Sequence, residues 1–167
     1  PAVAIVLGGP EVSHELETQP LAALADHVVV GEGEVAFAAL VDAVLRGRAP
    51  LTRIHQGGLP DLATLPLPYR EYSDHDLAHR VLYLEASRGC PFACEFCLSS
   101  LDTKVRSFPI EALLAELAEL IGRGARQLKF VDRTFNLSAK TSHAILDFLL
   151  ERQHLADLAR RGVPSFQ

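Results

Sequence analysis

The sequence lacks several features that would point directly to a function. Its 167 residues include no methionine, and its three cysteines all lie between residues 90 and 97. The net charge is −5 and the basic residues form no run, which argues against duplex nucleic acid as a partner. No apolar stretch has the length of a membrane span and no signal peptide is recognisable. We therefore expect no membrane association and a cytoplasmic location.

An odd number of cysteines in one short segment also argues against a disulfide framework, so we expect reduced thiols. With 49% hydrophobic and 22% charged residues, the composition is that of a globular protein. One strand-like run begins at residue 2 and another at residue 165. Together with the missing methionine, these runs predict that the chain is part of a longer protein.

Residues 1–50 alternate between strand-like and helix-like segments. Continuous apolar runs at 2–7 and 27–30 predict buried strands, and each is followed by glycines. Short helical turns are expected over 11–25, and a helix is expected to begin near residue 34 and to end near Gly47. This order predicts a parallel sheet covered by helices.

Residues 51–79 are rich in proline and show little periodicity, which predicts a linker between two domains. Residues 80–167 resume the alternation, with strands expected at 81–86 and 127–132, helices at 109–121 and 138–153, and a third strand from 165. The first of these helices has the strongest apolar repeat in the chain. The predicted fold class is therefore α/β, and the second half opens as β-α-β-α-β.

The cysteine loop, residues 87–100 (SRGCPFACEFCLSS), follows the first strand of the second half. Cys90, Cys94 and Cys97 have the spacing C-x-x-x-C-x-x-C, which lets one loop wrap a compact centre. Thiolates favour iron-sulfur clusters, zinc or copper(I). On a four-iron cluster, three thiolates leave one iron free to bind a small molecule.

Two other kinds of site also use clustered cysteines. A zinc site with three cysteines and one histidine would need His75 or His79, which lie before the strand and outside the usual ligand spacing. An electron-transfer cluster normally has four thiolates. The alternative function is therefore a zinc- or iron-sulfur-stabilised binding or sensor module without chemistry at an open iron.

The stretch from Glu85 to Cys97 resembles the cluster loop of the radical S-adenosylmethionine superfamily, which has this cysteine spacing, a preceding strand and an aromatic residue before the last cysteine. The resemblance implies a 4Fe-4S cluster on Cys90, Cys94 and Cys97, with S-adenosylmethionine on the open iron and Phe96 against the adenine. It further implies reductive cleavage of S-adenosylmethionine to a 5′-deoxyadenosyl radical, with an electron donor such as flavodoxin or ferredoxin.

Members of this superfamily usually carry a Gly-Gly-Glu-like turn after the second strand. Residues 130–136 (FVDRTFN) lack glycine and instead resemble the Asp-containing version found in the cobalamin-linked branch. By this resemblance Asp132 would meet the ammonium group of S-adenosylmethionine, and Arg133 would be available for its carboxylate. The other interpretation is that Asp132 caps the turn that follows.

The first half resembles the later strands of the flavodoxin-like cobalamin-binding domain that precedes many radical S-adenosylmethionine domains. The resemblance rests on IVLGGPEVS at 5–13 and VVVGEGE at 28–34. It implies that Gly8 and Gly9 let the nucleotide tail of cobalamin approach the backbone, with Gly31 and Glu32 nearby. The segment LPLPY at 65–69 resembles the junction between the two domains.

These resemblances predict three parts. Residues 1–50 would be the C-terminal part of a Rossmann-type cobalamin-binding domain, 51–79 a linker, and 80–167 the opening of a radical S-adenosylmethionine (β/α)6 partial barrel. The predicted protein activates an inert C–H bond or transfers a methyl group through cobalamin, on a small-molecule or otherwise unknown substrate. No catalytic residue is assigned beyond the cysteine loop.

Overall fold

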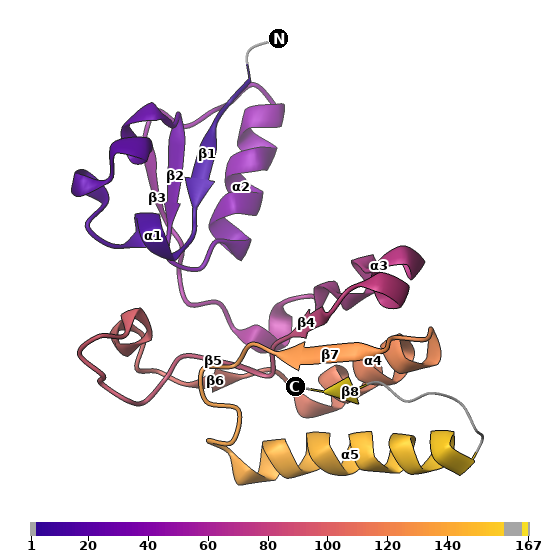
Figure 1. Cartoon of the computed structure of the whole chain (residues 1–167). Coiled ribbons are helices and arrows are strands. Elements are labelled where there is room, and N and C mark those ends of the chain that lie inside the picture. Colours follow the sequence, from indigo (N-terminus) through magenta and orange to yellow (C-terminus); the bar gives the residue numbers. More distant parts are fainter. Residues whose placement is uncertain (1–2, 159–164, 167) are drawn as a thin grey trace. The chain divides into compact units, whose positions relative to one another are not determined.

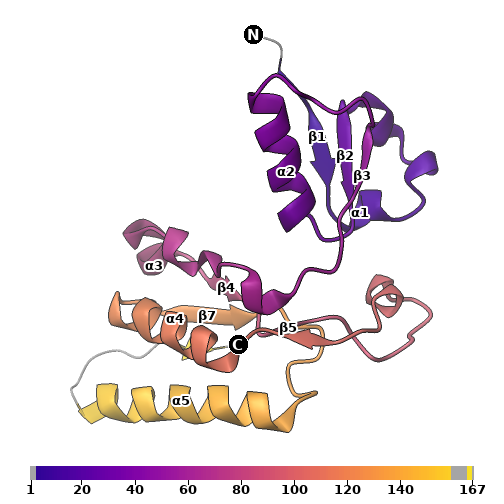
Figure 2. The same cartoon turned by 180° about the vertical axis from the view of Figure 1, so that it is seen from behind.

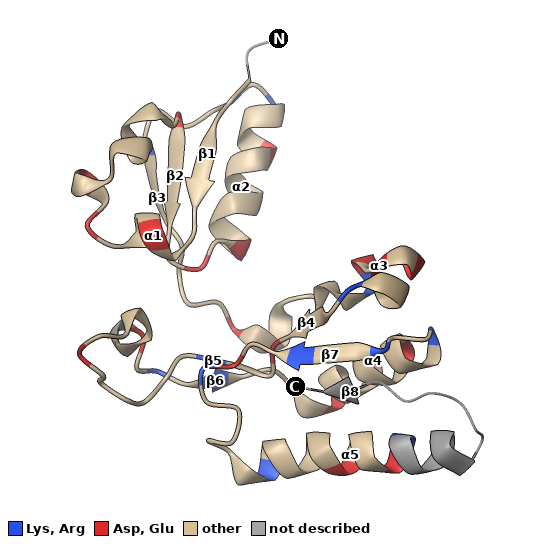
Figure 3. Ribbon diagram, viewed as in Figure 1, with Lys and Arg blue, Asp and Glu red and all other residues tan. Residues whose placement is uncertain are grey.

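The structure, a computed structural model, describes residues 3–158 and 165–166. The chain divides into two compact units, Pro1–Asp61 and Leu62–Gln167. In the first unit Asp and Glu positions outnumber Lys and Arg positions, whereas in the second unit the two kinds are interspersed along the ribbon (Figure 3). Among the described residues, no helix combines the length and the apolar character needed to cross a membrane.

The first unit is built on a parallel sheet in the order β1-β2-β3 (Figure 1). The strands are β1 (Val6–Gly8), β2 (His27–Val30) and β3 (Ile54–Gln56). The connection from β1 to β2 contains α1 (Pro10–Ser13), η1 (Leu16–Thr18) and η2 (Pro20–Leu24), whereas α2 (Glu34–Leu45) connects β2 to β3. The predicted parallel strands and the helix near 34–45 are therefore present.

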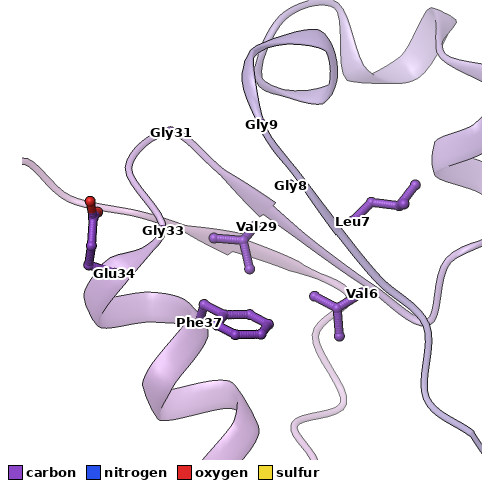
Figure 4. A pocket seen from close by; sticks show the side chains of 9 residues that line it. All are labelled: Val6, Leu7, Gly8, Gly9, Val29, Gly31, Gly33, Glu34 and Phe37. Atoms are coloured by element: carbon purple, nitrogen blue, oxygen red, sulfur yellow. The ribbon is translucent and has the colours of Figure 1, made fainter. Parts of the chain in front are cut away.

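The two faces of this sheet have different neighbours, because successive side chains of a strand point to opposite sides. Val28 packs with Val12, Ala22 and Ala25 in a buried core. Val29, one residue further along β2, points to the other face, where Phe37 of α2 lies (Figure 4).

The second unit contains the predicted β-α-β-α-β order. Strands β4 (Leu82–Leu84), β7 (Gln127–Phe130) and β8 (Ser165–Phe166) form a parallel sheet in that order, connected by α4 (Ile110–Gly122) and α5 (Ala139–Leu158). Helix α4 lies behind β7 in Figure 1 and in front of it in Figure 2. The core consists of apolar side chains from the strands and both helices, including Leu82, Leu84, Leu113, Leu117, Leu120, Leu128 and Ile145.

Residues 51–79, predicted as a linker, are divided between the two units. Strand β3 belongs to the first sheet, and η3 (Leu62–Thr64), η4 (Pro68–Glu71) and α3 (Asp74–His79) belong to the second unit. Helix α3 begins with a capping box in which Ser73 Oγ accepts the Asp76 N–H, and the Asp76 carboxylate accepts the Ser73 N–H. The hydrogen bonds from the hydroxyl and the N–H of Ser73 lower the pKa of the Asp76 carboxyl.

Two tyrosines of the same segment close the outward edge of β4. The hydroxyl of Tyr69 accepts the Glu85 N–H at 2.8 Å and donates to the Glu85 carbonyl at 3.2 Å. The hydroxyl of Tyr72 does the same at Tyr83, with distances of 3.1 and 3.0 Å. The backbone carbonyl of Leu84 points toward β7, where it accepts the Val131 N–H. The backbone groups of residues 83 and 85 therefore point to the opposite edge of β4, and each residue is hydrogen-bonded there by one tyrosine hydroxyl in place of a neighbouring strand.

Replacing Tyr69 by phenylalanine is expected to lower the free energy of unfolding by about 2 kcal/mol, because a part-buried N–H and carbonyl of Glu85 lose their partner. Tyr69 is 4% exposed, whereas Tyr83 is 53% exposed, so Tyr83→Phe is the matched control. Urea unfolding measures both. Equal effects of the two substitutions would contradict the role given to the Tyr69 hydroxyl.

The same residue predicts a pH dependence. Burial raises the pKa of Tyr69 from 10.0 to about 12. The stability contributed by the neutral phenol is therefore complete below pH 10.0 and is lost as the pH rises through about 12. Tyr69→Phe should remove this part of the loss of stability at alkaline pH. A difference in the free energy of unfolding between wild type and variant that stays constant from pH 10.0 to about 12 would contradict this prediction.

Candidate functional site

The cysteine loop is closed at its base by a two-stranded antiparallel ribbon. Strand β5 (Ser87–Arg88) pairs with β6 (Arg106–Ser107), so the chain leaves and returns at the same place. Within the loop the Cys90 N–H donates to the Asp102 carbonyl at 2.9 Å, and η5 (Leu98–Leu101) follows the last cysteine. The loop begins just after β4, at the carboxyl end of a parallel strand, which is where α/β proteins place their sites.

Gly89 makes the sharp entry into this loop possible. Its φ is +86°, a conformation that L side chains rarely adopt. A Cβ at this position would also collide with the backbone carbonyl of Lys104, in the segment that precedes β6. The entry to the loop is therefore a backbone-to-backbone contact that no other residue allows without a shift.

The three thiols are free and differ in exposure. Cys90 is buried, Cys97 is half-buried and Cys94 is exposed. Hydrogen bonds from the N–H and the hydroxyl of Ser99, with a smaller contribution from the charge of Arg133, lower the pKa of Cys97. A lowered pKa favours the thiolate, which is the metal-binding form.

The donor set fits a metal centre in its chemistry, since three free thiols share one loop and thiolates are the usual ligands of iron-sulfur clusters. Within residues 3–158 and 165–166, however, no three His, Cys, Asp or Glu side chains are gathered so as to hold a metal ion. The three thiols are thus present on one loop, and they are not gathered into one coordination group.

The segment after β7 lies against the cysteine loop, and the tip of β7 lies beside β5 in both views (Figures 1 and 2). Asp132 accepts the Ala86 N–H at 2.9 Å and the Ser87 hydroxyl at 2.6 Å. The hydroxyl of Thr134 lies 3.5 Å from Cys90 Sγ. Thr134 lies two residues after Asp132 in the same motif, which is the only sequence signal for its place beside the loop.

The other residues predicted to bind S-adenosylmethionine lie at the surface. Phe96 is 94% exposed, and Arg133 is also exposed while still close enough to Cys97 to lower its pKa. The structure therefore brings Asp132 and Arg133 to the cysteine loop, and it leaves the Phe96 ring in solvent.

A pocket of about 420 Å³ lies at the carboxyl ends of β1 and β2 in the first unit (Figure 4). It brings together Gly8, Gly9 and Gly31, three of the four residues predicted near cobalamin. Glu32 lies in the same turn but does not line the pocket. The full lining is Val6, Leu7, Gly8, Gly9, Val29, Gly31, Gly33, Glu34 and Phe37.

Ser13 connects the two glycine turns of this pocket, a role that sequence reasoning missed. Its hydroxyl donates to the Gly9 carbonyl at 2.8 Å and accepts the Gly31 N–H at 2.9 Å. Gly31 has a φ of +83°, and a Cβ there would lie 3.3 Å from the Gly57 carbonyl. The rim of the pocket is thus held by one side chain and by a close backbone approach.

Comparisons with known proteins bear on both halves. No model of a protein family matches the chain. It is 32% identical to an uncharacterized methyltransferase of Pyrococcus horikoshii, covering 83% of this chain and 35% of the relative. It is also 32% identical to the bacteriochlorophyllide d C-8(2)-methyltransferase of Chlorobaculum tepidum, covering 88% of this chain and 36% of that enzyme. The chain thus spans about a third of the length of these relatives.

Among solved structures, the fold is similar to that of the radical S-adenosylmethionine methyltransferase TsrM from Kitasatospora setae with cobalamin and a [4Fe-4S] cluster bound. The TM-score is 0.57 at 17% identity, and the match covers 90% of this chain and 34% of that one. A second structure of the same enzyme, with tryptophan and an S-adenosylmethionine analogue, gives a TM-score of 0.61 at 16% identity.

The fold and the site define an α/β protein with a three-cysteine loop at the carboxyl end of the first strand of its second parallel sheet. The chain thus shares the fold of a radical S-adenosylmethionine methyltransferase over the matched part, and it is similar in sequence to proteins named methyltransferases and methylthiotransferases.

Proposed function

We propose that the protein is a radical S-adenosylmethionine enzyme whose 4Fe-4S cluster is held by Cys90, Cys94 and Cys97. The observation that carries this proposal is the set of three free thiols on one loop, which starts at the carboxyl end of β4 and lies against the segment after β7. When bound, such a cluster supplies the electron that cleaves the sulfonium of S-adenosylmethionine to methionine and a 5′-deoxyadenosyl radical. An external donor such as flavodoxin or ferredoxin would provide that electron.

The residues around the loop would bind and orient S-adenosylmethionine. Arg133 would pair with its carboxylate, and the exposed ring of Phe96 would stack on its adenine. Asp132 uses one lone pair of each carboxylate oxygen for the loop, so lone pairs remain for the ammonium group.

The reaction class we infer is methyl transfer assisted by cobalamin, because two relatives are named methyltransferases. The pocket of the first unit supports this, since Gly8, Gly9 and Gly31 leave room for a nucleotide tail beside the backbone. We propose that residues 1–61 belong to the cobalamin-binding domain and residues 62–167 to the radical domain. The substrate accepting the methyl group is left open.

Anaerobic reconstitution with iron and sulfide tests the proposal. We expect a 4Fe-4S absorption and electron paramagnetic resonance spectrum that S-adenosylmethionine perturbs, and 5′-deoxyadenosine after addition of dithionite. Cobalamin retained through purification would support the methyl-transfer class over a cobalamin-free radical reaction.

Two results would contradict the proposal. If the protein binds one zinc ion per chain and no cluster, and if His79→Ala lowers its affinity for zinc, the protein is a zinc-stabilised binding module. A cluster whose spectrum and redox chemistry ignore S-adenosylmethionine would indicate a sensor or an electron carrier.

A further inference from the structure

The geometry points to Asp132 and Thr134 as positioning residues that fix the cysteine loop to the carboxyl end of β7. The role concerns the protein's own loop and is separate from any contact with S-adenosylmethionine. It rests on the proposed function only for the identity of what the loop holds.

Asp132 fixes the start of the loop. One carboxylate oxygen accepts the Ala86 N–H at 2.9 Å and the other accepts the Ser87 hydroxyl at 2.6 Å. Ala86 is 3% exposed, so its N–H has no access to water as a replacement. Hydrogen bonds to an ionised acceptor are stronger than neutral ones, and here they join residues 45 and 46 positions apart in the chain.

These bonds form where the chain changes direction. Residues 82–84 pair with β7, and residues 87–88 pair with β6, so Ala86 and Ser87 stand at the transition between the two sheets. The Ala86 carbonyl accepts the Phe108 N–H on the returning side. Asp132 therefore determines the direction in which the chain leaves β4 toward Cys90.

Thr134 acts at the first cysteine. Its hydroxyl lies 3.5 Å from Cys90 Sγ, and Cys90 is the buried thiol of the three. A thiolate has no proton to give, so in the metal-binding form the hydroxyl must be the donor. A hydrogen bond to a ligand sulfur is one of the factors that set the potential of an iron-sulfur cluster.

The two contacts make different predictions. Asp132→Asn leaves one acceptor oxygen, now uncharged, and places an NH₂ donor opposite the Ser87 hydroxyl, which must then accept instead of donate. Both hydrogen bonds lose the ionised acceptor and weaken, so the loop entry loosens. Thr134→Val keeps the size of the side chain and removes the hydroxyl, whereas Thr134→Ser keeps the hydroxyl and serves as the rescue.

The first experiment needs no metal. Amide hydrogen exchange of the apoprotein, resolved at residues 85–88, is expected to show exchange at Ala86 faster by about 10- to 100-fold in Asp132→Asn. The control is Asp147→Asn, the same change of charge at an exposed carboxylate of α5, which should leave Ala86 unchanged. Ser87→Ala removes only the partner hydroxyl and gives a smaller acceleration, which keeps the test available if Asp132→Asn does not fold.

The second experiment uses the reconstituted protein. Thr134→Val is expected to shift the midpoint potential of the cluster to more negative values, and Thr134→Ser to restore it. Asp132→Asn is expected to lower the iron content, whereas Asp147→Asn is not.

The outcomes separate this inference from the proposed function. Equal Ala86 exchange in Asp132→Asn and Asp147→Asn would overturn the role of Asp132, even if the wild-type protein carries the cluster. If the wild-type protein binds no cluster, the proposed function is refuted. The positioning role of Asp132 is still supported in that case if Asp132→Asn accelerates exchange of the Ala86 amide. Potentials that are identical in Thr134→Val and wild type would overturn the role of Thr134.

Discussion

Replacing Cys90, Cys94 or Cys97 singly by serine is expected to abolish the cluster and to reduce cleavage of S-adenosylmethionine to the uncatalysed background. Serine presents a hard, protonated oxygen in place of a soft thiolate, and the remaining two thiols cannot hold a four-iron cluster alone. Iron and sulfide content per chain, together with 5′-deoxyadenosine formation under dithionite, measure the effect.

Glu95→Gln is the matched control for these substitutions. Glu95 lies in the same loop between Cys94 and Cys97, and its side chain is exposed. The control should retain the wild-type iron content. A serine variant that keeps a full cluster would remove that cysteine from the ligand set, and full clusters in all three variants would refute the proposed site.

Gly89→Ala is expected to have the largest effect on stability of any substitution in the loop, lowering the free energy of unfolding by about 2–4 kcal/mol. The positive φ disfavours a side chain, and the added Cβ would overlap the Lys104 carbonyl. Both the positive φ and the overlap with the Lys104 carbonyl are properties of the backbone, so no side chain can rotate to relieve them. The loop can relieve them only by a shift of the backbone that leads to Cys90. The cluster content should therefore fall together with the stability.

Gly58→Ala makes the same chemical change where space is available, because a Cβ at Gly58 has no heavy atom within 4 Å. Thermal unfolding of the two variants and iron content after reconstitution give the comparison. A Gly89→Ala protein with the stability and iron content of Gly58→Ala would contradict the close contact between the two sides of the loop.

The elements with a strong side-chain pattern could be predicted from the sequence. Helix α4 was expected from its apolar repeat, and it buries Leu113, Leu117 and Leu120 along one face. Strand β2 was expected from a continuous apolar run, and its burial on both faces explains why that run is continuous rather than alternating.

The missed elements depend on backbone and tertiary contacts. Strand β3, with the sequence IHQ, has no apolar pattern and joins the sheet by pairing with β2. Helix α3 had a readable signal in the capping box of Ser73 and Asp76, three positions apart, which the proline-rich surroundings obscured.

The sequence predicts which residues belong to the candidate site, but it does not predict the hydrogen bonds between them. The spacing of the cysteines identifies the loop, and the glycine turns identify the pocket, because both are local in sequence. The hydrogen bonds of Asp132 to Ala86 and Ser87 cross 46 and 45 positions, so only the folded sheet brings them together. The two turns joined by Ser13 likewise meet only because β1 and β2 are parallel neighbours.

The tyrosines at β4 have a consequence for synthesis on the ribosome. Tyr69 and Tyr72 precede β4 in the chain, whereas β7, on the other side of β4, is made more than forty residues later. The residues that close the outer edge of β4 therefore leave the ribosome before the strand itself does. An unpaired strand edge is a site of aggregation, and this order of emergence lets one edge of the nascent strand be covered while its inner edge waits for β7.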